Sequence, residues 1–327
     1  MTDASAPQRL APTTDGGPVG PVMVIGGAED KLGERVILSR FAQLAGGDRA
    51  RIVVISTASS LGDAATELYR HIFARVGAVN VTGLRPETRE EANDPRTVEA
   101  LKDVTGIFMT GGNQLRLSSV IGGTKLGEAI LDAHGRGVVV AGTSAGASAV
   151  ATHMMAFGSS GATPKHRMAH VSVGLGLVVN VVVDQHFEQR TRLGRLRAVV
   201  AQSPSLIGLG LDEDTAAIID ANDVLEVIGR GSVTIVDGSD VITDAFQTTG
   251  HKPMMVSNAR LHSLPSGYRF DLLGRRVLPL EGSKNERVAQ LARGRISKMA
   301  KRVAAEGIDG RAPERRRLRE EDRKASE

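Results

Sequence analysis

The sequence of 327 residues contains no cysteine and no tryptophan, and aromatic residues make up only 3% of it. Without cysteine the chain can form no disulfide, no thiolate metal site and no cysteine nucleophile, so covalent chemistry falls to another side chain, with serine the leading candidate. The scarcity of aromatic rings also argues against a protein that stacks the bases of single-stranded nucleic acid.

Long hydrophobic runs are missing as well. No apolar stretch reaches the roughly 18 residues that a membrane span requires, and the first residues lack the basic-then-apolar pattern of a secretory signal peptide. We therefore expect a cytoplasmic protein that has no membrane partner. Hydrophobic residues make up 41% of the chain, which is long enough to bury one large core or two modest ones.

Positive charge is concentrated near the C-terminus. Residues 283–327 carry 14 Lys and Arg against 8 Asp and Glu, whereas residues 1–282 carry 27 against 29. Apolar residues at roughly helical intervals over 285–307 predict a basic amphipathic helix, followed by a disordered charged tail. Because the rest of the chain is nearly neutral, we expect no nucleic-acid partner. A polyanion-binding protein on an inactive hydrolase scaffold is the alternative from a different class.

The remaining sequence predicts one catalytic α/β domain over residues 21–282, after a disordered lead-in rich in Pro, Gly and Thr at residues 1–20. Amphipathic stretches, including those near 31–45 and 62–76, separate short apolar runs rich in β-branched residues at 22–27, 51–57, 106–112, 138–142 and 177–187. This alternation predicts a mostly parallel sheet flanked by helices on both faces. Short runs with tight turns after residue 205 predict antiparallel strands that extend the sheet.

One serine lies between two glycines where a buried strand gives way to an alanine-rich segment. The residues Gly142-Thr143-Ser144-Ala145-Gly146 fit the G-x-S-x-G nucleophile elbow. The glycines permit a sharp turn that leaves Ser144 exposed at the edge of the sheet, and the N–H of Ala145 would then point toward a developing oxyanion. The alternative is an ordinary turn in which Ser144 caps the helix.

A nucleophilic serine needs a base and an orienting acid. Of the eight histidines, His186 follows the strongly buried run "VVNVVVDQH" at its carboxyl end, and we expect this strand to bring it to the same edge as Ser144. Three acids, Asp212, Glu213 and Asp214, follow another strand. Strand alternation places Glu213 on the face opposite to both aspartates, but it does not decide which face looks toward His186.

Two further segments indicate what the site binds. Arginines crowd the stretch after His186 at positions 190, 192, 195 and 197, an arrangement that suits carboxylates, although a solvated basic helix face is the alternative. The segment Gly111-Gly112-Asn113-Gln114 follows another strand at the same edge, so its amides could hold substrate or complete an oxyanion hole. The segment "VIGGAED" lacks the G-x-G-x-x-G spacing, which argues against a dinucleotide cofactor.

The segments "GTSAGA", "DQHFEQRTRLGRL", "GLGLDEDTA", "FMTGGNQ" and "VIGGAEDK" together resemble the cyanophycinase family, serine exopeptidases of the peptidase E-like group, over about residues 22–220. The resemblance implies a class I glutamine amidotransferase-like fold, a flavodoxin-like sandwich with a nucleophile elbow, and a homodimer. It also implies the substrate: cyanophycin, a polyaspartate with arginine amide-linked to each side-chain carboxyl, cut to β-Asp-Arg dipeptides. We expect neither a cofactor nor a metal.

The resemblance also implies residue roles. Ser144 would be the nucleophile that forms an acyl-enzyme, His186 the base and Glu213 the orienting acid. The oxyanion hole that we expect from the two segments described above is formed by Gly112 and Ala145. The residues implied to line the substrate site are Gln114, Asp184, Gln185, Arg190, Arg192 and Arg195. The loop 158–168 diverges from the family pattern, which leaves the exact substrate open. An aspartyl dipeptidase of the same family is the alternative: it would share the nucleophile elbow but would have less reason to keep the arginine-bearing segment after His186.

Overall fold

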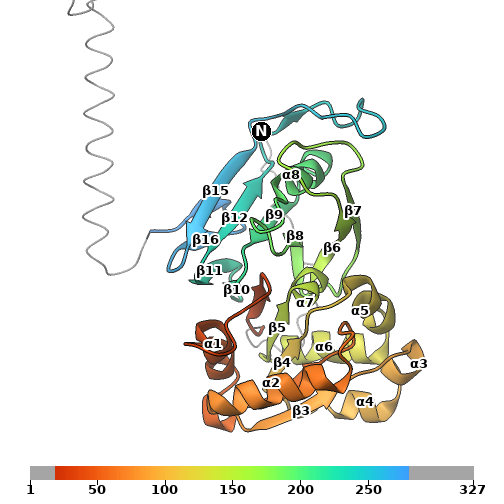
Figure 1. The fold of residues 1–327 in the computed structure, drawn as a ribbon, viewed down its shortest axis with the longest axis vertical. Helices are drawn as coiled ribbons and strands as arrows, with labels where there is room; N and C mark the ends of the chain where they lie inside the picture. The colour runs from red at the N-terminus through yellow and green to blue at the C-terminus, as the bar shows by residue number, and fades with distance from the viewer. Residues whose placement is uncertain (1–18, 280–327) are drawn as a thin grey trace, which may run out of the picture. The chain divides into compact units, whose positions relative to one another are not determined.

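The computed structural model describes residues 19–279 (Figure 1). The predicted basic helix and charged tail, and nearly all of the predicted lead-in, lie outside these residues. No helix of the described part is long and apolar enough to cross a membrane. The domain limits, the homodimer and the cytoplasmic location stay predictions.

Nine of the described strands form the first sheet, in the order β17-β16-β11-β10-β1-β5-β4-β2-β3. Five neighbouring strands run parallel: β1 (Val22–Ile25), β5 (Val139–Thr143), β4 (Gly106–Met109), β2 (Arg51–Ile55) and β3 (Asn80–Leu84). Beyond β1 the sheet continues with the antiparallel strands β10 (Thr215–Ile219), β11 (Val224–Gly229), β16 (Arg269–Asp271) and β17 (Arg276–Val277). The predicted parallel sheet with antiparallel additions is confirmed.

The central strands are apolar on both faces because helices or strands cover both faces. In β1, Met23 and Ile25 pack with α1 (Val36–Leu44) and α2 (Asp63–Arg75) on one side. Val22 and Val24 face a larger core on the other side, to which α5 (Gln114–Ile121) and α6 (Lys125–Gly135) contribute. The remaining short helices of this half are η1 (Gly47–Arg49), α3 (Arg89–Ala92) and α4 (Pro95–Glu99).

A second sheet holds six described strands in the order β15-β12-β9-β8-β6-β7 (Figure 1). The strands are β6 (Ala151–Gly158), β7 (Ala169–Val173), β8 (Val178–Asp184), β9 (Ile207–Leu211), β12 (Ser232–Asp237) and β15 (Arg260–Pro265). The helix α8 (Leu193–Gln202) packs on β9, and β13 (Ile242–Thr243) pairs with β14 (Val256–Ser257).

The expectation that the strand before His186 shares a sheet with the strand before Ser144 is therefore wrong. The helix after Ser144, α7 (Ala145–Ala149), has only five residues, and the chain enters the second sheet at Ala151 directly after it. Every residue of α7 is Ala, Gly or Ser and is buried, and the helix packs against strands of both sheets. These small side chains allow the two sheets to approach each other closely at the site.

The helix predicted over 31–45 begins later than expected because a carboxylate holds its first residues in a loop. Asp30 accepts backbone hydrogen bonds from Leu32, Gly33 and Arg35 at 3.0, 2.8 and 3.0 Å. These bonds lower the pKa of Asp30 to about 2, and the bond from Arg35 has the largest effect. An aspartate that accepts backbone hydrogen bonds in the preceding loop thus delays the helix beyond the point where its apolar periodicity starts.

Candidate active site

Ser144 occupies the sharp turn between β5 and α7 and has φ 51° and ψ −109°, a conformation that non-glycine residues rarely adopt. Its N–H donates a hydrogen bond of 2.9 Å to the carbonyl of Ile25 at the end of β1. A Cβ on Gly142 would lie 2.3 Å from the backbone of Gly146, and a Cβ on Gly146 would lie 2.5 Å from the carbonyl oxygen of Met109. Both glycines of the G-x-S-x-G pattern are therefore required by backbone contact.

His186 follows β8 and reaches Ser144 from the second sheet. Its Nε2 lies 2.9 Å from Ser144 Oγ. The backbone of His186 has φ 47°, and its N–H donates a hydrogen bond of 2.8 Å to the carbonyl of Gly26, which follows β1. The base is thus anchored to the end of the strand that also holds the serine turn.

Glu213 lies in the connection between β9 of the second sheet and β10 of the first, and its Oε1 is 2.6 Å from His186 Nδ1. The neighbouring aspartates have other partners. Asp212 accepts hydrogen bonds from the N–H and hydroxyl of Ser232 at 3.0 and 2.9 Å, and Asp214 accepts one from the N–H of Asp30 at 2.8 Å. Of the three consecutive acids, Glu213 is the one that faces the imidazole.

Burial of the His186 ring lowers its pKa below the ordinary value of 6.5. The hydrogen bond that His186 donates to Glu213 opposes this shift, whereas the positive charges of Arg190 and Arg192 add to it. The imidazole is therefore neutral at pH 7. A neutral ring that donates from Nδ1 to Glu213 leaves Nε2 free to accept the proton of Ser144.

Two glycines that follow β1, Gly26 and Gly27, contact both the segment that carries His186 and the segment that carries Glu213. Gly27 has φ 95°, and a Cβ at this position would lie 2.4 Å from Cε1 of His186. The carbonyl of Gly27 accepts a hydrogen bond of 2.9 Å from the N–H of Asp214, next to Glu213, while Gly26 holds His186. The sequence places these glycines at the end of a strand and within the family pattern, but it assigns them no contact with the base. That contact could not be predicted because the sequence does not show that β1 neighbours β5, the strand that ends at the serine turn.

Glu29, just beyond these glycines, is a second residue that the sequence analysis missed. Its carboxylate is almost fully buried and accepts hydrogen bonds from Thr143 Oγ1 at 2.7 Å and from the Tyr69 hydroxyl at 2.5 Å. Lys31 pairs with it at 2.8 Å. Burial is the main cause that raises the pKa of Tyr69 well above 10, and the negative charge of Glu29 is the second cause. This network fixes the residue that precedes Ser144.

The two amides predicted for the oxyanion hole belong to Gly112, in the loop after β4, and to Ala145, the residue after Ser144. Gly111 packs against Ser144, since a Cβ on Gly111 would lie 3.2 Å from Ser144 Cβ. Gly112 has φ 139°, and a Cβ there would lie 1.9 Å from the carbonyl oxygen of Ala58, so only glycine fits. In the described part of the chain, the N–H groups of Gly112 and Ala145 donate no hydrogen bond to another residue.

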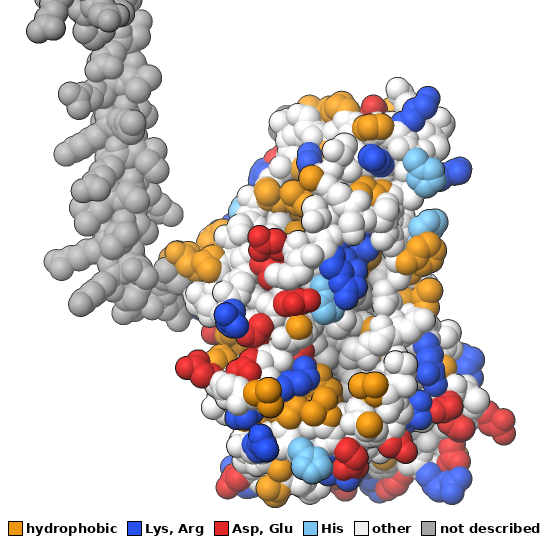
Figure 2. All heavy atoms as spheres, viewed as in Figure 1, with side chains coloured by type: hydrophobic (Ala, Val, Ile, Leu, Met, Phe, Trp, Pro, Cys, Tyr) orange, Lys and Arg blue, Asp and Glu red, His pale blue; other side chains and the backbone are white. Residues whose placement is uncertain are grey.

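The arginines after β8 differ in their surroundings. Arg190 is exposed, and within residues 19–279 its guanidinium forms no hydrogen bond or ion pair. Arg192 is buried, and its Nη1 donates to Asp184 Oδ1 at 3.2 Å and to both the side-chain oxygen and the carbonyl of Gln185. Burial lowers the pKa of Arg192 to about 10. Figure 2 shows basic and acidic side chains gathered around a histidine near the middle of one face.

Arg195 and Asp184 form a buried ion pair. Arg195 Nε lies 2.6 Å from Asp184 Oδ2, and a second bond joins Nη2 to Oδ1 at 2.5 Å. Asp184 has no exposed surface, and Arg195 also donates to the carbonyl of Gly158 at 3.0 Å. This geometry does not support the expectation that these two side chains contact substrate. Arginine spacing in a sequence does not distinguish a residue that binds a ligand from one that neutralises a buried carboxylate.

Two amide side chains were also expected at the substrate site. Gln114 Nε2 donates to the carbonyls of Met155 and Ala156 at 3.2 and 2.6 Å, so it ties α5 to β6. Gln185 is buried and accepts hydrogen bonds from Arg192. Both therefore have structural contacts, and only Gln114 is partly exposed.

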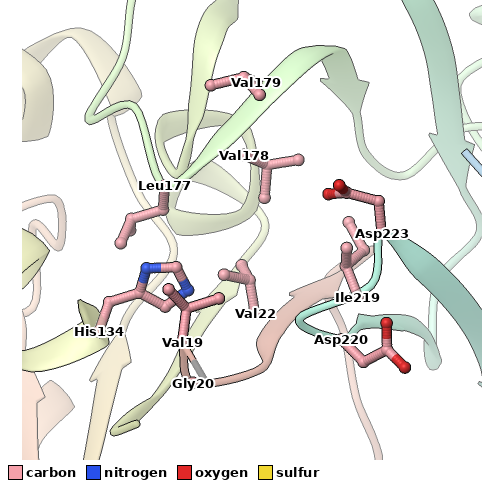
Figure 3. A pocket seen from close by; sticks show the side chains of 10 residues that line it. All are labelled: Val19, Gly20, Val22, His134, Leu177, Val178, Val179, Ile219, Asp220 and Asp223. Atoms are coloured by element: carbon pink, nitrogen blue, oxygen red, sulfur yellow. The ribbon is translucent and has the colours of Figure 1, made fainter. Parts of the chain in front are cut away.

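A small pocket of about 40 Å³ lies at the amino end of β1, whereas Ser144 follows the carboxyl end of the parallel neighbour β5. Figure 3 shows His134 of α6 on one side of it and Asp220 and Asp223 on the other. This pocket does not border the serine, histidine and glutamate. The described residues contain no group of three His, Asp or Glu side chains that could hold a metal ion.

Comparison with known proteins identifies the family of the chain. Residues 22–227 match the family model described as Peptidase family S51. The chain belongs to peptidase family S51. It is 42% identical over 260 residues to a cyanophycinase from Nostoc sp., covering 79% of this chain and 87% of that protein. It is 40% identical over 252 residues to a cyanophycinase from Geminocystis herdmanii, covering 76% and 93%.

Membership of family S51 makes the chain a serine peptidase. Its fold resembles the crystal structure of a peptidase from an acI-B1 Actinobacterium, with a TM-score of 0.57 and 22% identity over 77% of this chain and 97% of that one. The family resemblance and the α/β fold class expected from the sequence are confirmed.

Proposed function

We propose that the chain hydrolyses cyanophycin to β-Asp-Arg dipeptides through an acyl-enzyme on Ser144. The observation that carries the proposal is the pair of hydrogen bonds, 2.9 and 2.6 Å long, that links Ser144 to His186 and His186 to Glu213. The choice of substrate comes from the relatives, which are named cyanophycinases and match about four-fifths of the chain at 42% identity.

In the proposed reaction, Ser144 Oγ attacks the carbonyl carbon of the scissile peptide bond while His186 Nε2 takes its proton. Glu213 holds the resulting imidazolium in place. The N–H groups of Gly112 and Ala145 donate to the oxyanion that forms. His186 then gives the proton to the leaving amine, and the same residue activates the water that releases the acyl group.

Arg190 is the proposed carboxylate contact. It is exposed, and its backbone N–H donates a hydrogen bond of 3.1 Å to the carbonyl of His186, so its backbone lies beside the base. A guanidinium near the nucleophile binds a carboxylate at the end of the chain more tightly than an internal peptide unit, which suits an exopeptidase. Arg192 and Gln185 border the same region, and Gln114 stays a candidate for substrate contact because part of it is exposed.

A substrate panel tests this proposal. The purified chain and Ser144→Ala are each offered insoluble cyanophycin, β-Asp-Arg, several α-Asp-X dipeptides and casein, and products are identified by mass spectrometry. We expect β-Asp-Arg from the polymer, little action on casein, and no product from Ser144→Ala. Cleavage of α-Asp-X dipeptides with the polymer untouched would reassign the chain as an aspartyl dipeptidase, and inactivity on every substrate would favour a binding protein.

A further inference from the structure

A pocket of about 620 Å³ adjoins the proposed catalytic residues. Phe187 and Glu188 line it and directly follow His186, and Asp212 lines it and directly precedes Glu213. Strands β12 and β15 supply further lining residues. The pocket is therefore built partly from the two segments that carry the base and the orienting acid, and nothing in the proposed reaction uses it.

Two carboxylates make part of this pocket acidic. Glu188 is exposed, and within residues 19–279 its carboxylate has no hydrogen-bond or ion-pair partner. Asp212 is buried, and its charge is held by the N–H and hydroxyl of Ser232 and by the N–H of Glu188 at 3.2 Å. An unpaired carboxylate beside a buried one favours a cationic ligand.

A basic residue of the same lining carries a buried donor that lacks an acceptor. Arg192 lines it with a side chain that is only 9% exposed, and its Nε has no hydrogen-bond partner. A buried polar group without a partner is destabilising, and native proteins leave few of them. The guanidinium of Arg192 also gives this side of the lining a positive charge, which favours a carboxylate.

Apolar side chains complete the lining. Phe187 is almost fully buried, Leu193 is half-buried, and Leu261 is 55% exposed. Such a surface suits the methylene stem of a long side chain whose polar ends are bound elsewhere. The ligand that fits all of these features carries a cation and an anion joined by a short aliphatic chain.

We propose that this pocket binds one arginyl group of the polymer, with its guanidinium at Glu188 and Asp212 and its carboxylate at Arg192. The inference rests on the proposed function. Each arginine of cyanophycin is attached by an amide, so its α-carboxylate and its guanidinium both stay free, separated by a propyl stem. The pocket offers a matching group for each part.

Replacement of the guanidinium by a neutral group of the same shape tests the charge. Two soluble oligomers are compared, one of β-Asp-Arg units and one in which citrulline replaces arginine, with the wild-type chain, Glu188→Gln and the control Glu90→Gln. Glu90 is an exposed glutamate on α3, away from the pocket lining. We expect Glu188→Gln to lower kcat/KM about fivefold on the arginine oligomer only, as for an exposed ion pair. Glu90→Gln should change neither substrate.

A steric variant tests the pocket independently of charge. Ser263 lines the pocket and is exposed, so Ser263→Trp fills the space without removing a buried contact. We expect a raised KM for the arginine oligomer and an unchanged kcat on a β-aspartyl anilide, which has no arginyl group. Equal effects of Glu188→Gln on both oligomers, or no effect of either variant, would overturn the inference. A wild-type chain inactive on both oligomers would instead refute the proposed function.

Discussion

Gly27→Ala tests whether the loop after β1 positions the base. A Cβ at this glycine would lie 2.4 Å from Cε1 of His186, whereas ordinary contacts between carbon atoms lie at roughly 3.5–4.0 Å. The imidazole would have to move by about 1 Å, which lengthens its 2.9 Å contact with Ser144 Oγ. A misplacement of this size lowers catalytic rates on the order of 100-fold, so we expect kcat to fall by about that factor.

Gly77→Ala is the matched control. Gly77 has φ 92°, close to the 95° of Gly27, but a Cβ there would meet nothing within 4 Å. Both substitutions force alanine into a left-handed conformation, which destabilises each protein by about 1–2 kcal/mol. Any difference in activity between the variants therefore comes from the contact with His186 and not from backbone strain.

The assay is the release of β-Asp-Arg from cyanophycin, with urea unfolding of each variant beside it. We expect both variants to lose similar stability and Gly77→Ala to keep the wild-type kcat. If Gly27→Ala also keeps the kcat of the control, the imidazole tolerates the methyl group, and the argument that this glycine positions the base is refuted.

Three further predictions concern the reacting groups. Ser144→Ala and His186→Ala should each abolish turnover without unfolding the protein. Because the two residues act as one unit, the double variant should lose no more activity than either single variant, and additive losses would contradict this. Glu213→Gln should lower kcat more than Asp212→Asn or Asp214→Asn, since Glu213 alone faces the imidazole; the reverse order would exclude it as the orienting acid. Arg190→Ala should raise KM for carboxylate substrates about 10- to 150-fold, which corresponds to a loss of about 1.5–3 kcal/mol of binding free energy. In the wild type the positive charge of Arg190 lowers the pKa of His186, so its removal should raise that pKa. The acidic limb of the kcat/KM profile, which lies below pH 6.5 in the wild type, should therefore move to higher pH; an unmoved limb would separate Arg190 from the site.

The serine turn and the parallel strands could be predicted because local sequence determines both. A buried strand followed by G-x-S-x-G leaves little choice of backbone, since Cβ atoms at Gly142 and Gly146 would clash. Runs of β-branched residues likewise identify buried strands whatever their partners are. The order of the motifs along the chain was enough to indicate the family.

The partners of each strand and side chain could not be predicted in the same way. The periodicity of β8 is the same in either sheet, so it did not reveal that His186 approaches Ser144 from a second sheet. The burial of Asp184 against Arg195 depends on contacts between β8 and the residues of α8. The role of Gly27 depends on the neighbouring segment, which brings the His186 ring against its backbone. These are tertiary contacts, and a one-dimensional pattern does not contain them.

The central claim is that Ser144 is the nucleophile in cyanophycin hydrolysis. Its most direct test is to treat the protein with a fluorophosphonate in steps, to locate the adduct by mass spectrometry of peptides, and to measure β-Asp-Arg release at each step. We predict one adduct, on Ser144, and a loss of release proportional to its occupancy. An adduct on another residue, or full release from protein modified at Ser144, would contradict the account.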